Sequence, residues 1–399
     1  MSQQQALFYS TYYNTCYNRR ILLKSKIDPL EYEEDYFQKK PLNAKQDQKK
    51  AQNNDRSKFK KSNLDQKLKQ QQRQPLPKNL NTLSGRVITL SRQGYKVQIA
   101  DSTIFVCSLK GSMKKEQGSA KNLVVVGDIV HFEKVSEDYG VITRVEKRKS
   151  ELVRLDNLKR RQKQLIAANI DQVFITVSLM GPPLKPFLID RYILAAIKSG
   201  IEPIVVVNKI DYLQERPSFV SDTQFEQDKE NFEILKALES SYPFKLFFVS
   251  CETGENLDKL KKTMQGKTSV FAGQSGTGKS SLLNLLLAKN LDVGKIKEKT
   301  RKGSHTTSIS SLIALDGGGH CIDTPGIKSF GIWDLSKQDV ALAFPEFAPF
   351  SKECKFRACS HNLETGCAVK LAAEQGSIAL IRHQSYIHLM QEENLPFWK

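Results

Sequence analysis

The sequence contains no uninterrupted apolar run approaching 18 residues, so no transmembrane helix is expected. Its start, MSQQQALFYSTYY, lacks a basic segment followed by an apolar one, which argues against a secretory signal. Seven cysteines in 399 residues are too few for a disulfide scaffold and favour a reducing, cytoplasmic setting. Hydrophobic residues make up only 39% of the chain, below the usual level of about 45–50%. Part of the chain is therefore expected to lie outside any folded core.

Basic residues outnumber acidic ones. The chain has 61 Lys and Arg against 43 Asp and Glu, a net charge of +18, which points to a polyanionic partner such as nucleic acid or an anionic membrane. More than half of the excess lies in residues 39–78, which hold 13 Lys and Arg and 3 Asp. This Gln-, Lys- and Asn-rich stretch has little apolar surface to bury, so we expect it to be disordered. It is either an RNA-binding arm or a solvated linker.

Changes in composition and hydrophobic pattern along the sequence divide the chain into four expected parts. These are a disordered basic extension (1–80), a small all-β barrel of the OB type (81–152), a central α/β domain (153–333) and a mostly helical C-terminal domain (334–399). Five short alternating or apolar runs with turn signals between them indicate the barrel, a common nucleic-acid platform. These runs are residues 85–90, 95–100, 102–109, 124–135 and 139–148. One inter-strand loop carries lysines that either contact RNA or are simply solvated: Lys110, Lys114 and Lys115.

The central part alternates buried-strand runs with helical stretches, which predicts a three-layer α/β domain with a mostly parallel sheet. The strand runs are residues 171–178, 203–208, 244–250, 268–273 and 320–324. The helical stretches are residues 186–199, 222–240, 256–263 and 279–288. In the last part, short helical pieces surround a Cys/His cluster, and a helix over 384–393 follows.

A phosphate-binding motif, G-x-x-x-x-G-K-[ST], lies between a strand-like and a helix-like run, which is the context that it requires. Backbone N–H groups of such a turn, together with a helix N-terminus, form an anion site. Lys279 would reach the β- and γ-phosphates, and the Ser280 hydroxyl would ligate Mg²⁺. The alternative is a Gly-rich turn without a nucleotide. The expected nucleotide-binding residues here are Gly273, Gln274, Ser275, Gly276, Thr277, Gly278, Lys279, Ser280 and Ser281.

Two loops that follow predicted strands suit the recognition of guanine. Asp211 can accept hydrogen bonds from the N1–H and N2–H₂ groups of guanine, a donor pair that adenine lacks. Asn208 would brace this loop, and the stem of Lys209 would cover the base. The second loop could offer a backbone N–H to guanine O6. Its residues are Ser250, Cys251 and Glu252. Ligands of open α/β sheets bind at the carboxyl ends of the strands, where all of these loops are expected.

The Asp-Thr-Pro-Gly turn after residue 322 adds elements for Mg²⁺ and the γ-phosphate. Asp323 suits indirect binding of Mg²⁺, behind the groups that ligate the ion, and the N–H of Gly326 can face a γ-phosphate. In the preceding Gly-Ser-His-Thr-Thr segment, either Thr306 or Thr307 should ligate Mg²⁺ through its hydroxyl.

A candidate for activating the attacking water is His305. The position after the Asp-Thr-Pro-Gly turn that often carries a water-orienting Gln is Ile327, and an isoleucine cannot orient water. His305 is the polar residue closest by in sequence, so we predict that it positions the water or acts as general base. The alternative is an exposed loop histidine.

The order of these motifs is unusual. Ordinary small GTPases place the phosphate loop first and the two guanine loops last, whereas here the guanine loops come first. Such a circular permutation is tolerable because the termini of compact domains often lie close together. The segment after Asp323, the usual γ-phosphate sensor, then runs directly into the C-terminal domain, which its ordering could move.

Three cysteines and one histidine gather within fourteen residues near the C-terminus: Cys354, Cys359, His361 and Cys367. Three thiolates and one imidazole match a closed structural Zn²⁺ site, although the spacing is not the C-x₂-C of common fingers. Chance clustering is the alternative. The surrounding Lys352, Lys355 and Arg357 either contact RNA phosphate or form a solvated face.

The motifs together resemble one family, the circularly permuted GTPases that depend on the small ribosomal subunit, known as RsgA or YjeQ. The resemblance rests on NKID, SCETGENL, GQSGTGKSSLLN, GSHTT, IDTPGIKSFG and CKFRACSHNLETGC, and it runs from about residue 85 to the C-terminus. It implies an OB domain, a permuted GTPase domain and a zinc domain, with contacts to small-subunit rRNA. It also implies GTP hydrolysis stimulated by that subunit during late maturation, with His305 as the catalytic histidine. Cys251 stands where alanine is frequent in this family, and Thr365 stands where proline is frequent.

Three functions are compatible with these residues. The favoured one is a Mg²⁺-dependent GTPase that acts as an assembly factor on the small ribosomal subunit, with one structural zinc ion and no membrane partner. The second is an rRNA-binding module whose GTP state only sets affinity. An ATPase or kinase is disfavoured by Asp211. A monomer is expected.

Overall fold

The computed structural model describes residues 82–91, 93–111, 113, 123–155, 163–239, 241–287, 310–323 and 337–392. Several predictions lie outside these residues and are not addressed by the structure. They concern the basic extension, the loop lysines Lys114 and Lys115, and the switch residues His305, Thr306, Thr307 and Gly326.

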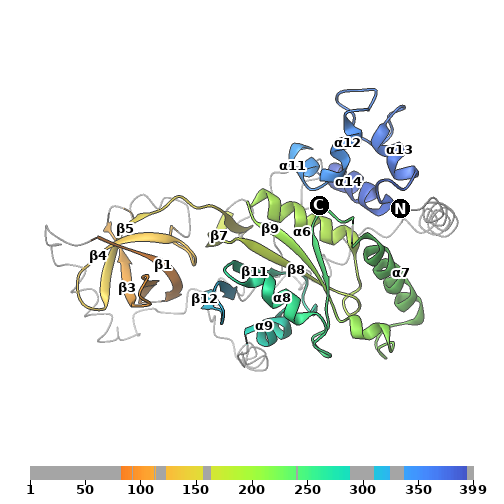
Figure 1. Cartoon of the computed structure of the whole chain (residues 1–399). Coiled ribbons are helices and arrows are strands. Elements are labelled where there is room, and N and C mark those ends of the chain that lie inside the picture. Colours follow the sequence, from red (N-terminus) through yellow and green to blue (C-terminus); the bar gives the residue numbers. More distant parts are fainter. Residues whose placement is uncertain are drawn as a thin grey trace, which may run out of the picture. The chain divides into compact units, whose positions relative to one another are not determined.

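Five strands close a barrel in the N-terminal part of the described chain, as predicted (orange to yellow in Figure 1). They are β1 (Thr82–Ser91), β2 (Gly94–Gln98), β3 (Ile104–Leu109), β4 (Ile129–Lys134) and β5 (Tyr139–Val145). The order β1-β2-β3-β5-β4 is closed by pairing of β1 with β4, and only β3 and β5 run parallel. Alternate residues of these strands fill the interior, where the rings of Phe105 and Phe132 lie 5.1 Å apart.

The central part has a mostly parallel sheet, which confirms the α/β prediction. Its spatial order is β10-β9-β8-β11-β13-β12, and only β12 runs antiparallel to its neighbour β13. The strands are β8 (Gln172–Ser178), β9 (Glu202–Asn208), β10 (Lys245–Phe248), β11 (Thr268–Ala272), β12 (Ser311–Ala314) and β13 (His320–Asp323). One backbone pairing, Thr89 with Ser311, joins β12 to β1 of the barrel.

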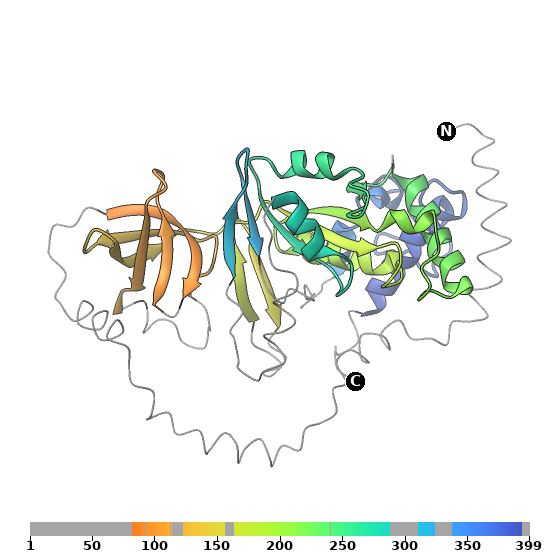
Figure 2. The ribbon, with the colours of Figure 1, turned by 90° about the horizontal axis from the view of Figure 1, so that it is seen from below.

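Helices cover both faces of the parallel strands. Figure 1 shows α6 (Pro186–Lys198) on one side and α8 (Leu257–Met264) and α9 (Lys279–Leu287) on the other, and the view from below brings α9 in front of the strands (Figure 2). The helix α7 (Asp222–Leu238) begins with a side-chain cap from Ser221, and a short 3₁₀ turn, η2 (Ile210–Leu213), follows β9. None of the helices in the described part of the chain is long and apolar enough to cross a membrane.

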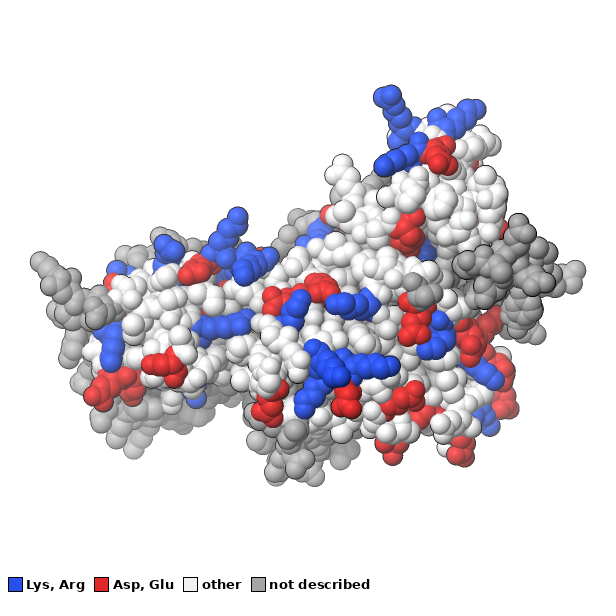
Figure 3. All heavy atoms as spheres, viewed as in Figure 1, with Lys and Arg blue, Asp and Glu red and all other residues white. Residues whose placement is uncertain are grey.

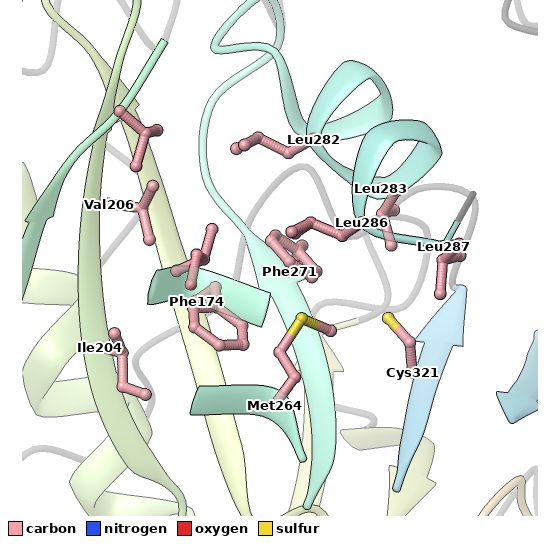
Figure 4. Close-up of a cluster of buried hydrophobic side chains, with 12 residues drawn as sticks. Phe174, Ile204, Val206, Met264, Phe271, Leu282, Leu283, Leu286, Leu287 and Cys321 are labelled. Atoms are coloured by element: carbon pink, nitrogen blue, oxygen red, sulfur yellow. The ribbon is translucent and has the colours of Figure 1, made fainter. Parts of the chain in front are cut away.

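The core beneath α8 and α9 explains why these segments are helical. Leucines of α9 recur on one face and point at the aromatic rings of the sheet (Figure 4). The rings of Phe174 and Phe271 stack there at 4.9 Å, with Met264 and Cys321 beside them. A helix with one apolar face gains most of its stability from such packing.

Three strands were not among the sequence predictions. A separate hairpin is formed by β6 (Glu151–Leu155) and β7 (Lys163–Ala168), and the short strand β12 precedes β13. Strands of four to six residues without strict alternation give little periodic signal. The last helix, α14 (Leu380–Glu392), begins four residues earlier than predicted.

The C-terminal part is helical, as predicted. It contains α11 (Lys337–Leu342), η3 (Pro345–Phe347), α12 (Ala348–Ser351), α13 (Ala368–Glu374) and α14. A buried guanidinium, Arg382 of α14, hydrogen-bonds Glu346 through two atoms and also Asp190 of α6. Burial alone would lower the pKa of Arg382, but the two carboxylates raise it. Because each charge has hydrogen-bonded partners, the ion pairs are tolerated in the interior.

Neighbouring leucines of α9 give a test of this core. Leu286→Ala should lower the free energy of unfolding by about 2–5 kcal/mol, because it leaves a cavity under the helix. Leu285 is 49% exposed on the same helix, so Leu285→Ala should change it by only about 0.5 kcal/mol. Urea unfolding of both variants checks this, and equal losses would contradict the assigned packing.

Candidate functional site

The phosphate-loop motif lies between β11 and the N-terminus of α9, as predicted. Gly273 has a φ of +139°, and a Cβ atom there would come within 2.0 Å of the Thr176 carbonyl oxygen, so only glycine fits. The Lys279 ammonium donates to the carbonyl oxygen of Gly273 at 2.8 Å and also to that of Gln274. The loop therefore curls around the ammonium, with the helix N-terminus behind it.

Asn208 joins the phosphate loop to both guanine loops. Its amide nitrogen donates to the Thr277 carbonyl oxygen at 3.0 Å, and its amide oxygen accepts from the backbone N–H of Cys251 at 3.3 Å. The side chain is buried, so these two bonds also satisfy its polar atoms. The structure thus brings together three loops that are up to 69 residues apart in the chain.

The second guanine loop holds the carboxylate of the first. The Ser250 hydroxyl donates to Asp211 Oδ1 at 2.6 Å and accepts from the backbone N–H groups of Glu252 and Thr253, both at 3.1 Å. Burial raises the pKa of the Cys251 thiol, so this half-buried side chain stays neutral. Asp211 is thereby fixed in orientation through its Oδ1 atom.

Lys209 lies beside a turn that the motif analysis did not single out. It adopts φ +65°, and its ammonium donates to the carbonyl oxygen of Gly181, which follows β8. Burial lowers the pKa of Lys209, while Asp211 opposes the shift. A Cβ atom built on Gly276 would meet Pro182 at 3.5 Å, so the Gly181–Pro182 turn also lies against the phosphate loop. A Gly-Pro dipeptide after a strand signals a turn but says nothing of its neighbours.

Asp323 ends β13, the strand next to β11, and is half-buried. Burial raises the pKa of its carboxyl group. The parallel pairing places it at the same edge of the sheet as the phosphate loop.

The Cys/His cluster is assembled as predicted. The potential ligand atoms of Cys354, Cys359, His361 and Cys367 all lie within 4.8 Å of one another. His361 Nδ1 is 3.6 Å from the sulfur of Cys354 and 3.5 Å from that of Cys367, and these two sulfurs are 3.9 Å apart. Four such atoms facing one point can hold a metal ion.

Neighbouring polar groups hold the loop that carries these side chains. Glu364 accepts hydrogen bonds from the hydroxyl and the N–H of Ser360 and from the N–H of Asn362, which lowers the pKa of its carboxyl group to about 2. His383 of α14 bonds the backbone oxygen of His361 at 2.7 Å. Neither residue was predicted to support the cluster, because each acts through backbone groups brought near by the fold.

The fold and the loops define a class. A phosphate loop on a central parallel strand, with an NKxD loop and a serine loop on neighbouring strands that precede it in the chain, is the arrangement of a circularly permuted P-loop GTPase.

Comparisons with known proteins identify the family within this class. A family profile described as RsgA GTPase matches residues 145–333. The chain is 38% identical over 319 residues to "Small ribosomal subunit biogenesis GTPase RsgA" of Chlorobaculum tepidum, covering 77% of this chain and 97% of that protein. It is 34% identical over 315 residues to the protein of the same name from Christiangramia forsetii, covering 78% and 96%. The chain belongs to the RsgA GTPase family.

Solved structures agree with this assignment. The crystal structure of YjeQ from Thermotoga maritima is similar with a TM-score of 0.60 and 28% identity, covering 78% of this chain and 99% of that one. That of YloQ, a circularly permuted GTPase, is similar with a TM-score of 0.58 and 25% identity, covering 82% and 100%.

Proposed function

We propose that the protein hydrolyses GTP as an assembly factor that binds the small ribosomal subunit and acts late in its maturation. The observation that carries the proposal is the union of the phosphate loop and the guanine loops at Asn208, in a chain whose curated relatives are named small ribosomal subunit biogenesis GTPases. Action in the cytoplasm, as a monomer, is part of the same proposal.

In this proposal each loop has a distinct role towards GTP. The backbone N–H groups of residues 273–281 hold the phosphates, and Lys279 exchanges its loop carbonyls for phosphate oxygens. Asp211 reads guanine while the stem of Lys209 covers the base. Mg²⁺ with GTP would be held by Ser280 and one of Thr306 and Thr307, with Asp323 behind it. The hydroxyl and carboxylate donors suit this hard ion, which would neutralise phosphate charge.

His305 is the proposed residue that positions the attacking water or takes its proton. GTP hydrolysis by a GTPase needs such a group. The side chain of Ile327, at the position that often carries a water-orienting Gln, has no polar atom. The side chains held around Asn208 would bind and orient the nucleotide.

Two described surfaces are proposed to contact rRNA. The barrel has the strand order and single parallel pair expected of an OB fold, a frequent nucleic-acid platform, and Lys110 follows its third strand. Around the Cys/His cluster, Lys352, Lys355 and Arg357 are exposed, and Figure 3 shows a group of Lys and Arg side chains over α12 and α13. Phosphate contacts would position the protein on the subunit.

The proposed division of labour follows the predicted boundaries: an OB domain at 81–152, a GTPase domain at 153–333 and a zinc domain at 334–399. Zinc is proposed for the Cys/His cluster because of the ligand spacing. A tetrahedral ion with bonds of about 2.3 Å to sulfur and about 2.0–2.1 Å to nitrogen places two sulfurs about 3.8 Å apart and sulfur and nitrogen about 3.6 Å apart. The observed separations of 3.9, 3.5 and 3.6 Å fit these values.

GTP turnover with and without purified small subunits tests the proposal. We expect stimulation by the subunits, with no turnover of ATP.

Lys279→Ala should abolish hydrolysis, because it removes the charge that compensates the phosphates. His305→Ala should leave GTP affinity near normal but lower stimulated turnover by about 10²- to 10⁴-fold. Unstimulated turnover would favour the alternative of an rRNA-binding module whose GTP state only sets affinity. Full activity of His305→Ala would place the catalytic group elsewhere.

Asp211→Asn should weaken GTP binding and shift selectivity towards xanthine nucleotides, because the new amide presents a donor to the donors of guanine. The lost charge-assisted contact is worth about 1.5–3 kcal/mol, a roughly 10- to 150-fold change in affinity. Competition between GTP and XTP measures the shift. An unchanged preference for guanine would remove Asp211 from the base site.

Purified protein should contain about one equivalent of zinc, because a structural site contributes folding free energy directly. Cys354→Ser or Cys367→Ser should lose the metal and unfold the C-terminal part while guanine nucleotide affinity is kept. Cys16→Ser, which changes a cysteine outside the Cys/His cluster, serves as control. Elemental analysis and circular dichroism provide the measurements. Protein without zinc, or a different bound metal, would overturn the assignment.

A further inference from the structure

A large aromatic side chain stands exposed beside the Lys209 loop. Phe219 is 66% exposed, yet the turn that carries it is well anchored. The N–H of Val220 donates to the carbonyl oxygen of Pro217 at 3.0 Å, and the Val220 side chain is buried. Arg216 donates to the carbonyl oxygen of Val220 and forms an ion pair with Asp222 at 2.9 Å. The turn thus presents the ring at a fixed place outside the core.

The Phe219 ring lies directly against the turn that holds Lys209. A Cβ atom on Gly181 would come within 2.7 Å of Phe219 Cε2 and 3.0 Å of Cζ, and Gly181 has a φ of +52°. The ring also meets Tyr212 edge to face, with centroids 6.1 Å apart. Lys209 Nζ lies 5.8 Å from the centroid of Tyr212 and donates to the Gly181 carbonyl oxygen. The ammonium therefore lies beside one ring, that of Tyr212, and one carbonyl oxygen, that of Gly181, and the Phe219 ring packs against both of these residues.

We propose that Phe219 and Tyr212 form an aromatic brace that positions Lys209 to cover the guanine base. They are positioning residues, because they act through Lys209 and the Gly181 carbonyl oxygen. The inference rests on the proposed base site and adds the residues that prepare it. A lysine held in place before the nucleotide arrives loses less side-chain freedom on binding, which raises affinity.

The brace also contacts the turn that connects the Lys209 loop to the phosphate loop. Phe219 packs on Gly181, and the adjoining Pro182 lies against Gly276 of the phosphate loop. Loss of the ring would free the Gly181–Pro182 turn and, with it, the partner of the Lys209 ammonium. Because guanine is common to GTP and GDP, the brace favours both nucleotides equally.

A double-mutant cycle with Lys209 tests this role. Phe219→Ala should raise the Kd for GTP and for GDP by the same factor, about 3- to 10-fold, while kcat is unchanged. In a Lys209→Ala background, the same change should have no further effect. Phe219→Tyr, which keeps the ring, should restore affinity. Tyr212→Leu, an independent variant, should weaken binding in the same direction. Phe356→Ala, which removes a ring that is 47% exposed near the Cys/His cluster, should leave both affinities unchanged.

The outcomes distinguish failure of the proposed brace from failure of the proposed base site. If Lys209→Ala weakens binding but Phe219→Ala has no effect, or adds its full effect in the Lys209→Ala background, the brace is overturned and the base site stands. If Lys209→Ala itself leaves affinity unchanged, the proposed base site fails and the brace fails with it. Titrations with fluorescent GDP and GTP analogues, with thermal unfolding of each variant, supply the readout.

Discussion

The nucleotide site depends on one buried amide. Asn208 holds the phosphate loop through the Thr277 carbonyl oxygen and the serine loop through the Cys251 N–H, and it belongs to the loop that carries Lys209 and Asp211. An unpaired amide in this position would cost free energy, so all three loops are kept in register. In the proposed function, the distance between the phosphate and base subsites would thereby be set by the protein before GTP binds.

Circular permutation leaves this geometry intact because strand neighbours, not chain order, bring the loops together. The phosphate-loop strand β11 lies between β8 and β13, whichever of them comes first in the chain. What the permutation changes is the connection after Asp323, which leads towards α11. That helix is joined to α6 by Lys198 and Asp339 at 3.1 Å, and α14 is joined to α6 by Arg382 and Asp190. The α6 helix follows the Gly181–Pro182 turn, so one helix connects this turn to the C-terminal part.

Much of this site was predictable because its chemistry demands particular residue types at fixed spacings. A phosphate loop needs glycines that permit φ above zero and a lysine at the helix start, and a closed tetrahedral site needs four soft or imidazole ligands. The motif analysis did not identify four features that lie beside these sites: the Gly181–Pro182 turn, Phe219, Glu364 and His383. They act through backbone carbonyls, rings and N–H groups that no spacing rule connects to the motifs.

By itself, the sequence determined the barrel, the parallel α/β core, the permuted motif order and the Cys/His cluster, since alternation, helical periodicity and motif spacing are local properties of a chain. The hairpin β6–β7, the strand β12 and the junction of Arg382 with Asp190 were decided only by the tertiary structure. The two residues of that ion pair lie 192 positions apart, and each compensates part of the cost of burying the other. Such a dependence between distant residues exists only once the fold has brought them together.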